Sequence, residues 1–384
     1  MKKRAPQRAE RNERREALAA VAKKVDAFRP AREVLKRVRA VPTIFPQFDH
    51  AARVGGLPIE RFMLVHGPSS HGKTAFVLGL MRSFLERDHF AVFIDAERTT
   101  PVDWAEKMMG PMVDHPGFLA SRPTTYEDTI LEVRGFLNTI IAAREVGKIP
   151  EDTAAIIVVD SLRKLVPQDL MKEILSDKGD TKAGRDRGGQ LKAKMNAAWM
   201  DELVPLLEAA QAGFVAIARE MVDPDADMWA KKFGSDYKIG GGGAIFYEAS
   251  LVMRVERASY VTHGEGKERK VYGERHRVTI RKTKVAGKDD KTSVGYFSTS
   301  NGVLIPEGFD TARDVLDLGV RLGVVKKNGA TLSFKGERIG AGEHAAVKAL
   351  AADPGRLATI DAAVREKFAL VEPLSHDSDG VIET

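Results

Sequence analysis

The chain has 384 residues, of which 43% are hydrophobic, and a net charge of +6, so it holds enough apolar material for one large domain with smaller ones beside it. It contains no cysteine, which excludes disulfides, thiol nucleophiles and thiolate metal sites. No apolar run approaches the roughly 18 residues of a membrane helix and the first residues lack the apolar segment of a secretory signal, so we expect a cytoplasmic protein with no membrane partner.

Residues 1–42 form a basic N-terminal element. Residues 1–40 carry fourteen Lys and Arg against five Asp and Glu, a net charge of +9, whereas the rest of the chain sums to −3. Two interpretations are open: an arm that meets nucleic acid or an acidic neighbouring subunit, or a solvated extension. The apolar spacing predicts an amphipathic helix over residues 14–39, broken near Pro30. Its apolar positions are Leu18, Val21, Val25 and Phe28.

Between residues 62 and 303, strand-like apolar runs alternate with helical stretches. The runs read RFMLVHG, AVFIDAE, AAIIVVDS, GFVAIARE, ASLVMRVER and RHRVTIRKTK. This alternation predicts an α/β fold with a mainly parallel sheet and crossover helices.

The loop GPSSHGKTA matches the pattern G-x-x-x-x-G-K-[ST] between a strand-like and a helix-like run. In such a loop the backbone N–H groups surround phosphates, Lys73 supplies a charge to the outer phosphates, and the Thr74 hydroxyl ligates Mg²⁺. The sequence therefore predicts an ATP site. Its loop residues are Gly67, Pro68, Ser69, Ser70, His71, Gly72, Lys73, Thr74 and Ala75.

Two strand ends supply candidate carboxylates for this site. Asp160 ends the run AAIIVVD and is predicted to hold Mg²⁺ together with Thr74. Glu97 follows the strand-like FID and is a candidate to polarise the water that attacks the γ-phosphate. The alternative for Glu97 is a carboxylate that caps the next helix.

Two long polar segments, residues 172–190 and 221–243, interrupt the alternation and suggest functional connections. After Pro306 the composition indicates a small helical module, here residues 305–370, and residues 371–384 form a short acidic tail.

The order of these motifs resembles the RecA recombinases over nearly the whole chain. The most discriminating stretch is DLGVRLGVVKKNGATLSFKGERIGAGEHAAVKAL, which resembles the RecA C-terminal domain. The resemblance implies a RecA-like ATPase core with a mixed, mostly parallel sheet over residues 43–304, and a small α/β C-terminal domain. It also implies that residues 1–42 serve oligomerisation.

The resemblance further implies roles for single residues. Glu97 falls at the position of the family's catalytic glutamate, and Lys282 and Lys284 match a lysine pair that reaches the γ-phosphate from the adjacent protomer. Without the family, that pair would be taken as a solvated strand edge. Trp104 matches a tyrosine that stacks on adenine, and Tyr247 lies where an aromatic residue of the subunit interface is expected.

By the same resemblance, segments near residues 170–190 and 221–243 match the family's two DNA-binding loops. Met228 and Trp229 are apolar residues in a polar loop, where insertion between unstacked bases competes with packing against the core. Gly241 and Gly242 allow a close approach to phosphates. The remaining DNA-binding candidates are Arg185, Arg187, Lys192 and Lys194.

Several positions depart from the family pattern. Where an asparagine–glutamine pair senses the γ-phosphate, this chain has Ala218 and Arg219, and Arg219 could still bind that phosphate with a full charge. Asp201 occupies the place of a DNA-facing arginine, and His71 replaces a serine or similar residue in the loop.

The motifs predict a site for ATP and Mg²⁺, and the resemblance implies a diverged, DNA-dependent ATPase. As a RecA-type homo-oligomer, it would form a helical filament on single-stranded DNA and pair that strand with homologous double-stranded DNA. Two alternatives remain: a hexameric helicase with the same core, and a regulatory DNA-binding paralogue that lacks strand exchange.

Overall fold

A computed structural model describes residues 4–22, 24–25, 29, 31–35, 37–175, 182–223, 237–239, 243–263, 270–286, 292–298 and 308–371. The chain divides into two units, Met1–Val38 and Arg39–Thr384, and each is described by itself. No helix of the described residues is both long enough and apolar enough to cross a membrane.

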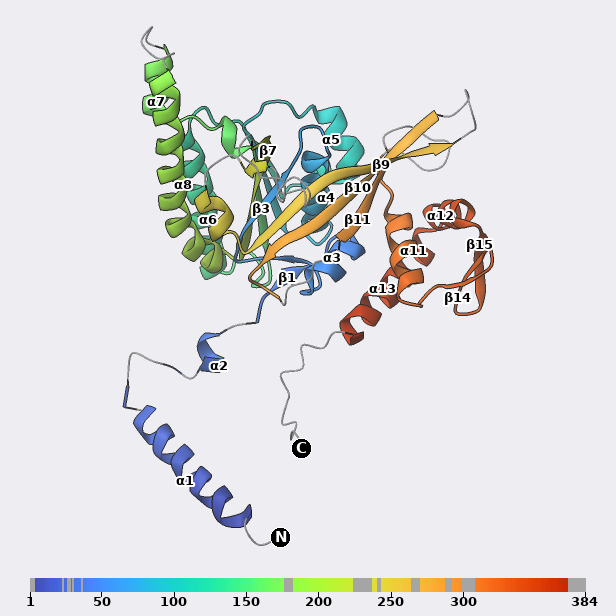
Figure 1. Cartoon of the computed structure of the whole chain (residues 1–384), viewed down its shortest axis with the longest axis horizontal. Helices are drawn as coiled ribbons and strands as arrows, with labels where there is room; N and C mark the ends of the chain where they lie inside the picture. The colour runs from blue at the N-terminus through green and yellow to red at the C-terminus, as the bar shows by residue number, and fades with distance from the viewer. Residues whose placement is uncertain are drawn as a thin grey trace. The chain divides into compact units, whose positions relative to one another are not determined.

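The N-terminal unit contains two helices, α1 (Arg4–Ala22) and α2 (Ala31–Val34) (Figure 1). The prediction of one helix over residues 14–39 is wrong at both ends. The helix begins ten residues earlier, with Pro6 in its first turn, where a missing N–H costs nothing. It ends at Ala22, because the N–H groups of Lys24 and Val25 donate to carbonyls only three residues back and close the last turn.

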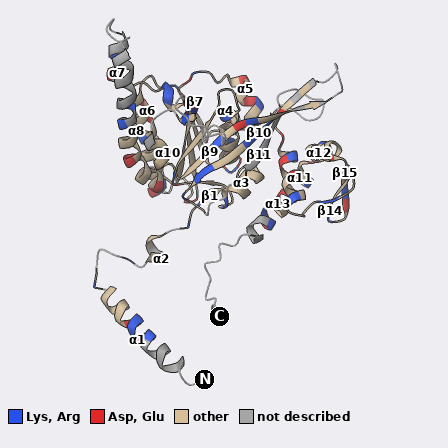
Figure 2. Ribbon diagram, viewed as in Figure 1, with Lys and Arg blue, Asp and Glu red and all other residues tan. Residues whose placement is uncertain are grey.

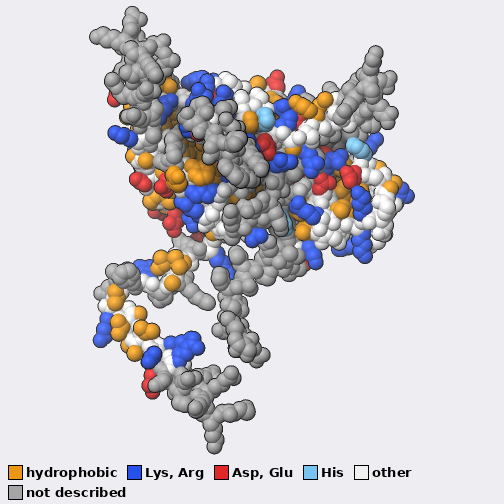
Figure 3. All heavy atoms as spheres, in the orientation of Figure 1, with side chains coloured by type: hydrophobic (Ala, Val, Ile, Leu, Met, Phe, Trp, Pro, Cys, Tyr) orange, Lys and Arg blue, Asp and Glu red, His pale blue; other side chains and the backbone are white. Residues whose placement is uncertain are grey.

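The described part of α1 carries basic residues (Figure 2). Hydrophobic side chains lie on the surface of this unit (Figure 3). Leu18 is 69% exposed and Val21 is 63% exposed. The unit therefore has an apolar surface that it does not bury within itself.

A ten-stranded sheet forms the centre of the larger unit. Its parallel strands are β3 (Phe62–Gly67), β4 (Phe90–Asp95), β5 (Phe118–Ser121), β6 (Ala155–Asp160), β7 (Ala212–Val222) and β9 (Leu251–His263), in the order β9-β3-β7-β6-β4-β5. The antiparallel strands β10 (Lys270–Thr283), β11 (Thr292–Ser298) and β12 (Gly308–Phe309) extend it beyond β9, and β8 (Tyr237–Ile239) pairs with β7. The predicted mixed, mostly parallel α/β sheet is confirmed.

Helices cover both faces of this sheet, as a buried parallel sheet requires. Because successive strand residues point to opposite faces, Met63 and Val65 of β3 join one core cluster and Phe62 and Leu64 join the other. The first cluster includes residues of α3 (Pro46–Ala52), α4 (Lys73–Leu85) and α5 (Val102–Met109). The second includes residues of α6 (Tyr126–Glu145), α8 (Lys182–Ala210) and α10 (Gly243–Glu248).

The polar segment 172–190 is largely helical, although we expected a connection. Helix α7 (Gln168–Leu175) covers its start, and α8 begins at Lys182. Lys, Arg, Gln and Ala are good helix formers, so polar composition alone does not exclude a helix. Of the second polar segment, residues 224–236 and 240–242 lie outside the described residues.

The C-terminal domain is α/β, as the family resemblance implied, and not the purely helical module that composition suggested. It consists of α11 (Thr311–Arg321), β13 (Lys326–Asn328), β14 (Thr331–Phe334), β15 (Glu337–Ala341), α12 (Glu343–Ala351) and α13 (Pro354–Val371). The turn between β14 and β15 has positive φ at Lys335 (49°) and Gly336 (87°), the geometry of a tight hairpin. Residues 372–384, most of the expected acidic tail, lie outside the described residues.

Two buried carboxylates connect this domain to helix α3. The Gln47 amide of α3 donates to Asp314 of α11 at 2.6 Å. Arg365 of α13 donates to Asp49 of α3 at 2.6 Å. Asp49 is fully buried, so this charge depends on its partner from the C-terminal domain.

Candidate nucleotide-binding site

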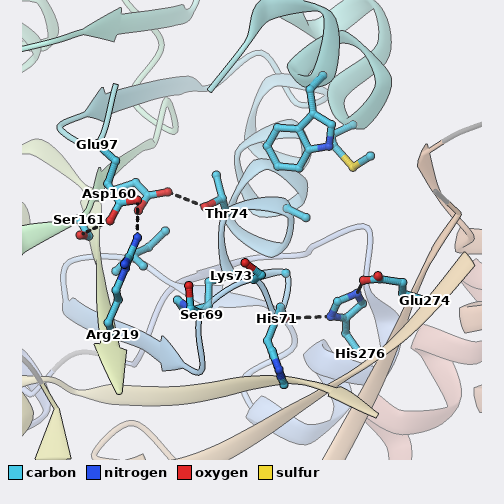
Figure 4. A pocket seen from close by; sticks show the side chains of 16 residues that line it. Ser69, His71, Lys73, Thr74, Glu97, Asp160, Ser161, Arg219, Glu274 and His276 are labelled. Atoms are coloured by element: carbon cyan, nitrogen blue, oxygen red, sulfur yellow. Dashed lines mark hydrogen bonds and ion pairs between the residues drawn. The ribbon is translucent and has the colours of Figure 1, made fainter. Parts of the chain in front are cut away.

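A cavity of about 360 Å³ lies at the carboxyl ends of the parallel strands, with most of its lining at one end of the sheet (Figure 4). The strand register explains the convergence, because Gly67 of β3 lies beside Arg219 of β7, and Asp95 of β4 lies beside Asp160 of β6. Ligands bind at this edge in open α/β sheets. Its lining residues are Ser69, Ser70, His71, Gly72, Lys73, Thr74, Ala75, Glu97, Trp104, Met108, Asp160, Ser161, Ile217, Arg219, Glu274 and His276.

The glycine-rich loop leads from β3 directly into α4, which begins at Lys73. Gly72 has φ of 83°, and a Cβ there would lie 2.4 Å from the ring of His276. A side chain is therefore excluded by both conformation and space. The loop presents the N-terminal N–H groups of α4, which attract anions.

Lys73 is buried and folds back over its own loop. Its ammonium donates to the carbonyls of Gly67 at 3.0 Å and Pro68 at 2.6 Å. Burial lowers the pKa of Lys73, because a desolvated ammonium is less stable. Gly67 and Pro68, predicted as ATP-binding residues, thus hold the lysine and do not line the cavity.

Thr74 and Asp160 meet at the cavity wall, where the Thr74 hydroxyl donates to the Asp160 carboxylate at 2.6 Å. Burial raises the pKa of Asp160 to about 6. A hydroxyl and a buried carboxylate in contact form the hard oxygen donor set that Mg²⁺ prefers. These two residues therefore fit the predicted metal, and the described residues hold no cluster of three or more His, Cys, Asp or Glu that would suit another.

Glu97 faces the same cavity between two partners. Ser161 donates to one carboxylate oxygen at 3.0 Å, and Arg219 donates to the other at 3.0 Å (Figure 4). The alternative role as a helix cap is not observed, since α5 has Pro101 at its N-cap and no side-chain hydrogen bond there.

Trp104 lies in α5 and lines the cavity with Met108 of the same helix. Met108 belongs to the first core cluster, and Trp104 packs against that cluster. They give one wall an apolar surface of the kind that stacks on a base.

Lys282, Lys284 and Tyr247 lie together but do not line this cavity. The Lys282 ammonium donates to the carbonyls of Phe246 and Tyr247 at 2.7 and 2.6 Å, at the end of α10. Lys284 donates to the carbonyl of Glu248 at 3.5 Å. Tyr247 is 70% exposed, so the three form one accessible surface patch.

Of the predicted DNA-binding residues, only Lys192 and Lys194 have side chains that the structure describes. Lys194 is exposed, whereas Lys192 is partly buried and donates to the Arg163 carbonyl at 3.0 Å. Asp201 is exposed on α8. Arg185 and Arg187 lie in α8, but the structure does not describe their side chains. Met228, Trp229, Gly241 and Gly242 also lie outside the described residues.

The cavity includes residues that sequence reasoning missed. Ser161 follows Asp160 directly and could have been found from the motif. Glu274 and His276 come from β10, about 200 residues after the loop with which they line the cavity, and no local pattern marks them.

Comparisons with known proteins agree with these features. Residues 25–298 match the family model of the RecA N-terminal domain, and residues 313–369 match that of the RecA C-terminal domain. Protein RecA of Syntrophus aciditrophicus is 28% identical over 349 residues, which cover 91% of this chain and 90% of that protein. Protein RecA of Mycolicibacterium smegmatis is 27% identical over 361 residues, 94% and 91% of the two chains. Protein RecA of Kineococcus radiotolerans is 29% identical over 359 residues, 92% and 91% of the two chains.

Proposed function

Because this chain belongs to the RecA family, we propose that it is a DNA-dependent ATPase that forms a helical filament on single-stranded DNA and pairs that strand with homologous duplex. The proposal is carried by one observation. The loop lysine, the Thr74–Asp160 pair and Glu97 line a single cavity at the end of the sheet. A phosphate-binding loop and a carboxylate aimed into the same cavity suit hydrolysis of a triphosphate.

In this proposal the loop binds the phosphates, and Lys73 exchanges the carbonyls of Gly67 and Pro68 for phosphate oxygens. Thr74 and Asp160 would hold Mg²⁺, which when bound neutralises charge on the phosphates. Trp104 would stack on the base.

Glu97 would orient and deprotonate the attacking water. Its position supports this role, because Ser161 fixes one oxygen while the other contacts Arg219. Arg219 would leave this ion pair to meet the γ-phosphate, and the Glu97 oxygen that it releases would then be available to the water.

Lys282 and Lys284 would complete the pocket of a neighbouring subunit. Neither lysine lines the cavity of its own chain, and Lys282 lies beside the exposed Tyr247, which supports a role across an interface. A cation supplied by a neighbour makes hydrolysis depend on assembly, because the charge of the transition state lacks its partner in a lone subunit.

The N-terminal unit would bind the core of the next subunit. Its exposed apolar residues, which include Leu18 and Val21, and its net positive charge are suited to a partner surface that is apolar and acidic.

Electron microscopy with single-stranded DNA and a slowly hydrolysed ATP analogue tests this function. We expect helical filaments from the wild type and none from Lys73→Ala, which loses a phosphate-binding charge. Lys326→Ala, which removes an exposed lysine of the C-terminal domain, is the control and should form filaments normally. Closed rings would favour the helicase, and dispersed molecules the regulatory paralogue.

Strand exchange needs its own assay, because the positions occupied by Arg219 and Asp201 depart from the family pattern. We expect ATP turnover to rise on single-stranded DNA and labelled homologous strands to be exchanged. Turnover without any exchange would favour the paralogue.

A further inference from the structure

The wall of the cavity beside the glycine-rich loop contains a carboxylate that the proposed function does not use. Glu274 and His276 lie two residues apart on β10, so both side chains point to the same face of the strand. Both line the cavity with the loop (Figure 4).

His276 contacts the loop directly, and Glu274 is connected to the loop through His276 and Arg257. The Nδ1 atom of His276 lies 3.0 Å from the carbonyl oxygen of His71, and its Nε2 atom lies 3.0 Å from Oε2 of Glu274. Arg257 of β9 also contacts Oε2 of Glu274 at 3.0 Å, and it donates to the Ser70 carbonyl at 2.7 Å. The carboxylate therefore has a defined position relative to the loop.

Charge does not exclude this carboxylate from a nucleotide site. A lone carboxylate beside a triphosphate would repel it, but here Arg257 and His276 both contact the same oxygen. Because those contacts converge on Oε2 and the side chain is 19% exposed, the carboxylate can accept a further hydrogen bond from the cavity. An acceptor with these properties selects a ligand that donates, such as a hydroxyl or an amino group.

The position of the carboxylate along the cavity decides between these donors. Glu97, Asp160 and Arg219 lie at one end of the cavity, Glu274 and His276 lie at the other, and the loop lies between them (Figure 4). The terminal phosphate belongs at the Glu97 end, so the nucleoside belongs at the Glu274 end. His276 touches His71 and Gly72 of the loop itself, so this wall adjoins the phosphates, and the nucleotide unit next to the phosphates is the sugar.

We propose that Glu274 is a ribose-binding residue that accepts a hydrogen bond from a sugar hydroxyl of ATP and so makes the site prefer ribonucleotides to their deoxy analogues. His276 and Arg257 are positioning residues that hold the carboxylate, and the Arg257 guanidinium balances its charge. The inference rests on the proposed function, because it takes the cavity as a nucleotide site.

Equilibrium binding of nucleotides to the full chain without DNA tests this subsite, because it needs neither filament nor turnover. The ligands are ATP, 2′-deoxy-ATP, 3′-deoxy-ATP and ITP, which lacks the amino group of adenine. We expect the wild type to bind at least one deoxy analogue roughly tenfold more weakly than ATP, the value of one charge-assisted hydrogen bond. Glu274→Ala should bind ATP and that analogue equally.

Two further variants separate this role from a structural one. Glu274→Gln keeps the shape of the side chain and a neutral acceptor, so it should retain a preference for ATP over the deoxy analogue that is smaller than that of the wild type. This variant replaces Glu274→Ala in the test if Glu274→Ala does not fold. Glu256→Ala removes a carboxylate of β9 that pairs with Arg254 and Arg277 outside the cavity lining, and it should leave the preference unchanged. A residue that only supports the loop would weaken all nucleotides equally and leave their ratio intact.

Three results would overturn the subsite: equal wild-type binding of ATP and both deoxy analogues, a preference that persists in Glu274→Ala, or a preference of the wild type against ITP alone that Glu274→Ala abolishes. The last would assign the carboxylate to the base. A wild type that binds no nucleotide would overturn the proposed function itself, and the subsite with it.

Discussion

Arg219 pairs with the Glu97 carboxylate at the end of the cavity where the terminal phosphate is expected. It donates to Glu97 at 3.0 Å and lies beside Gly67 in the sheet register. A guanidinium in this place can exchange a carboxylate for a phosphate, because both offer paired oxygens to its N–H groups. It therefore offers a way for the site to distinguish a triphosphate from a diphosphate.

We expect Arg219→Ala to weaken the binding of ATP more than that of ADP, lowering the ATP preference roughly tenfold, because a charged hydrogen bond to the γ-phosphate is lost. Calorimetric titration with both nucleotides measures the ratio. Arg163→Ala removes an exposed arginine that does not line the cavity and should leave the ratio unchanged. Equal weakening of ATP and ADP by Arg219→Ala would rule out the contact with the γ-phosphate.

The next residue of β7, Glu220, forms a buried polar cluster behind the site. Its carboxylate contacts Nδ1 of His66 at 2.9 Å and accepts hydrogen bonds from Arg254 at 2.7 and 3.1 Å. Burial alone would raise the pKa of Glu220, but its hydrogen bonds with His66 and Arg254 outweigh burial and lower the pKa to about 2. The cluster thus joins β3, β7 and β9 through an ionised carboxylate.

We expect Glu220→Gln to lower the free energy of unfolding by about 2 kcal/mol at neutral pH, because Arg254 loses one of its two charged partners and keeps only Glu256. The folded-state pKa lies below the ordinary value of 4.5, so the contribution of Glu220 is complete above pH 4.5 and is lost as the pH falls toward 2. Urea unfolding across this range should show the gap between wild type and variant closing with acid. A gap that stays constant would contradict an ionised Glu220 in the folded state.

At the residue scale, local sequence predicted Lys73, Thr74, Asp160 and Glu97, because each belongs to a short motif at a strand end. The long-range contacts of the cavity residues were not predictable in the same way. Arg219 contacts Glu97 across 122 residues of sequence, and His276 contacts His71 across 205. Only the folded sheet brings such pairs together.

Among the elements, the C-terminal domain depends on α13 for its connection to α3. Arg365 donates to the buried Asp49 at 2.6 Å and to the Thr43 carbonyl at 2.7 Å. Burial raises the pKa of Asp49 to about 6 against the opposing effect of Arg365. The arginine therefore supports a carboxylate that the core could not otherwise keep ionised.

We expect Arg365→Ala to lower the free energy of unfolding by about 3–5 kcal/mol, because it leaves a buried charge without its partner. Arg356→Ala is the matched control on the same helix, where the arginine pairs with an exposed Glu337 at 3.8 Å, and it should cost less than about 1 kcal/mol. Urea unfolding of both variants measures the difference. Equal costs would show that the contact with Asp49 does not hold the domain.

The strands were predicted best where the sequence contains a run of buried or alternately buried apolar residues. The apolar runs of β3, β4, β6, β7, β9 and β10 identified these strands correctly. Strand β5 was missed, because it is short and only partly buried, with Leu119 42% exposed. The start of α8 was missed because polar helix formers and glycines resemble a connection.

For the whole molecule, the central claim is that one subunit completes the triphosphate pocket of the next. The cavity of a single chain contains Glu97 and the glycine-rich loop but not Lys282, which lies beside the exposed Tyr247 instead. The two halves of such a pocket lie on different subunits. Neither the sequence nor the structure of one chain therefore shows the contact between them.

The most direct test mixes two inactive variants, Glu97→Ala and Lys282→Ala, on single-stranded DNA and measures ATP hydrolysis. If Lys282 acts across the interface, about a quarter of the interfaces in an equal mixture combine an intact Glu97 with an intact Lys282, and activity returns. Mixing Glu97→Ala with Lys73→Ala is the control, because both changes affect the same half of the pocket and no interface is restored. No recovery at any ratio of Glu97→Ala to Lys282→Ala would contradict the shared pocket.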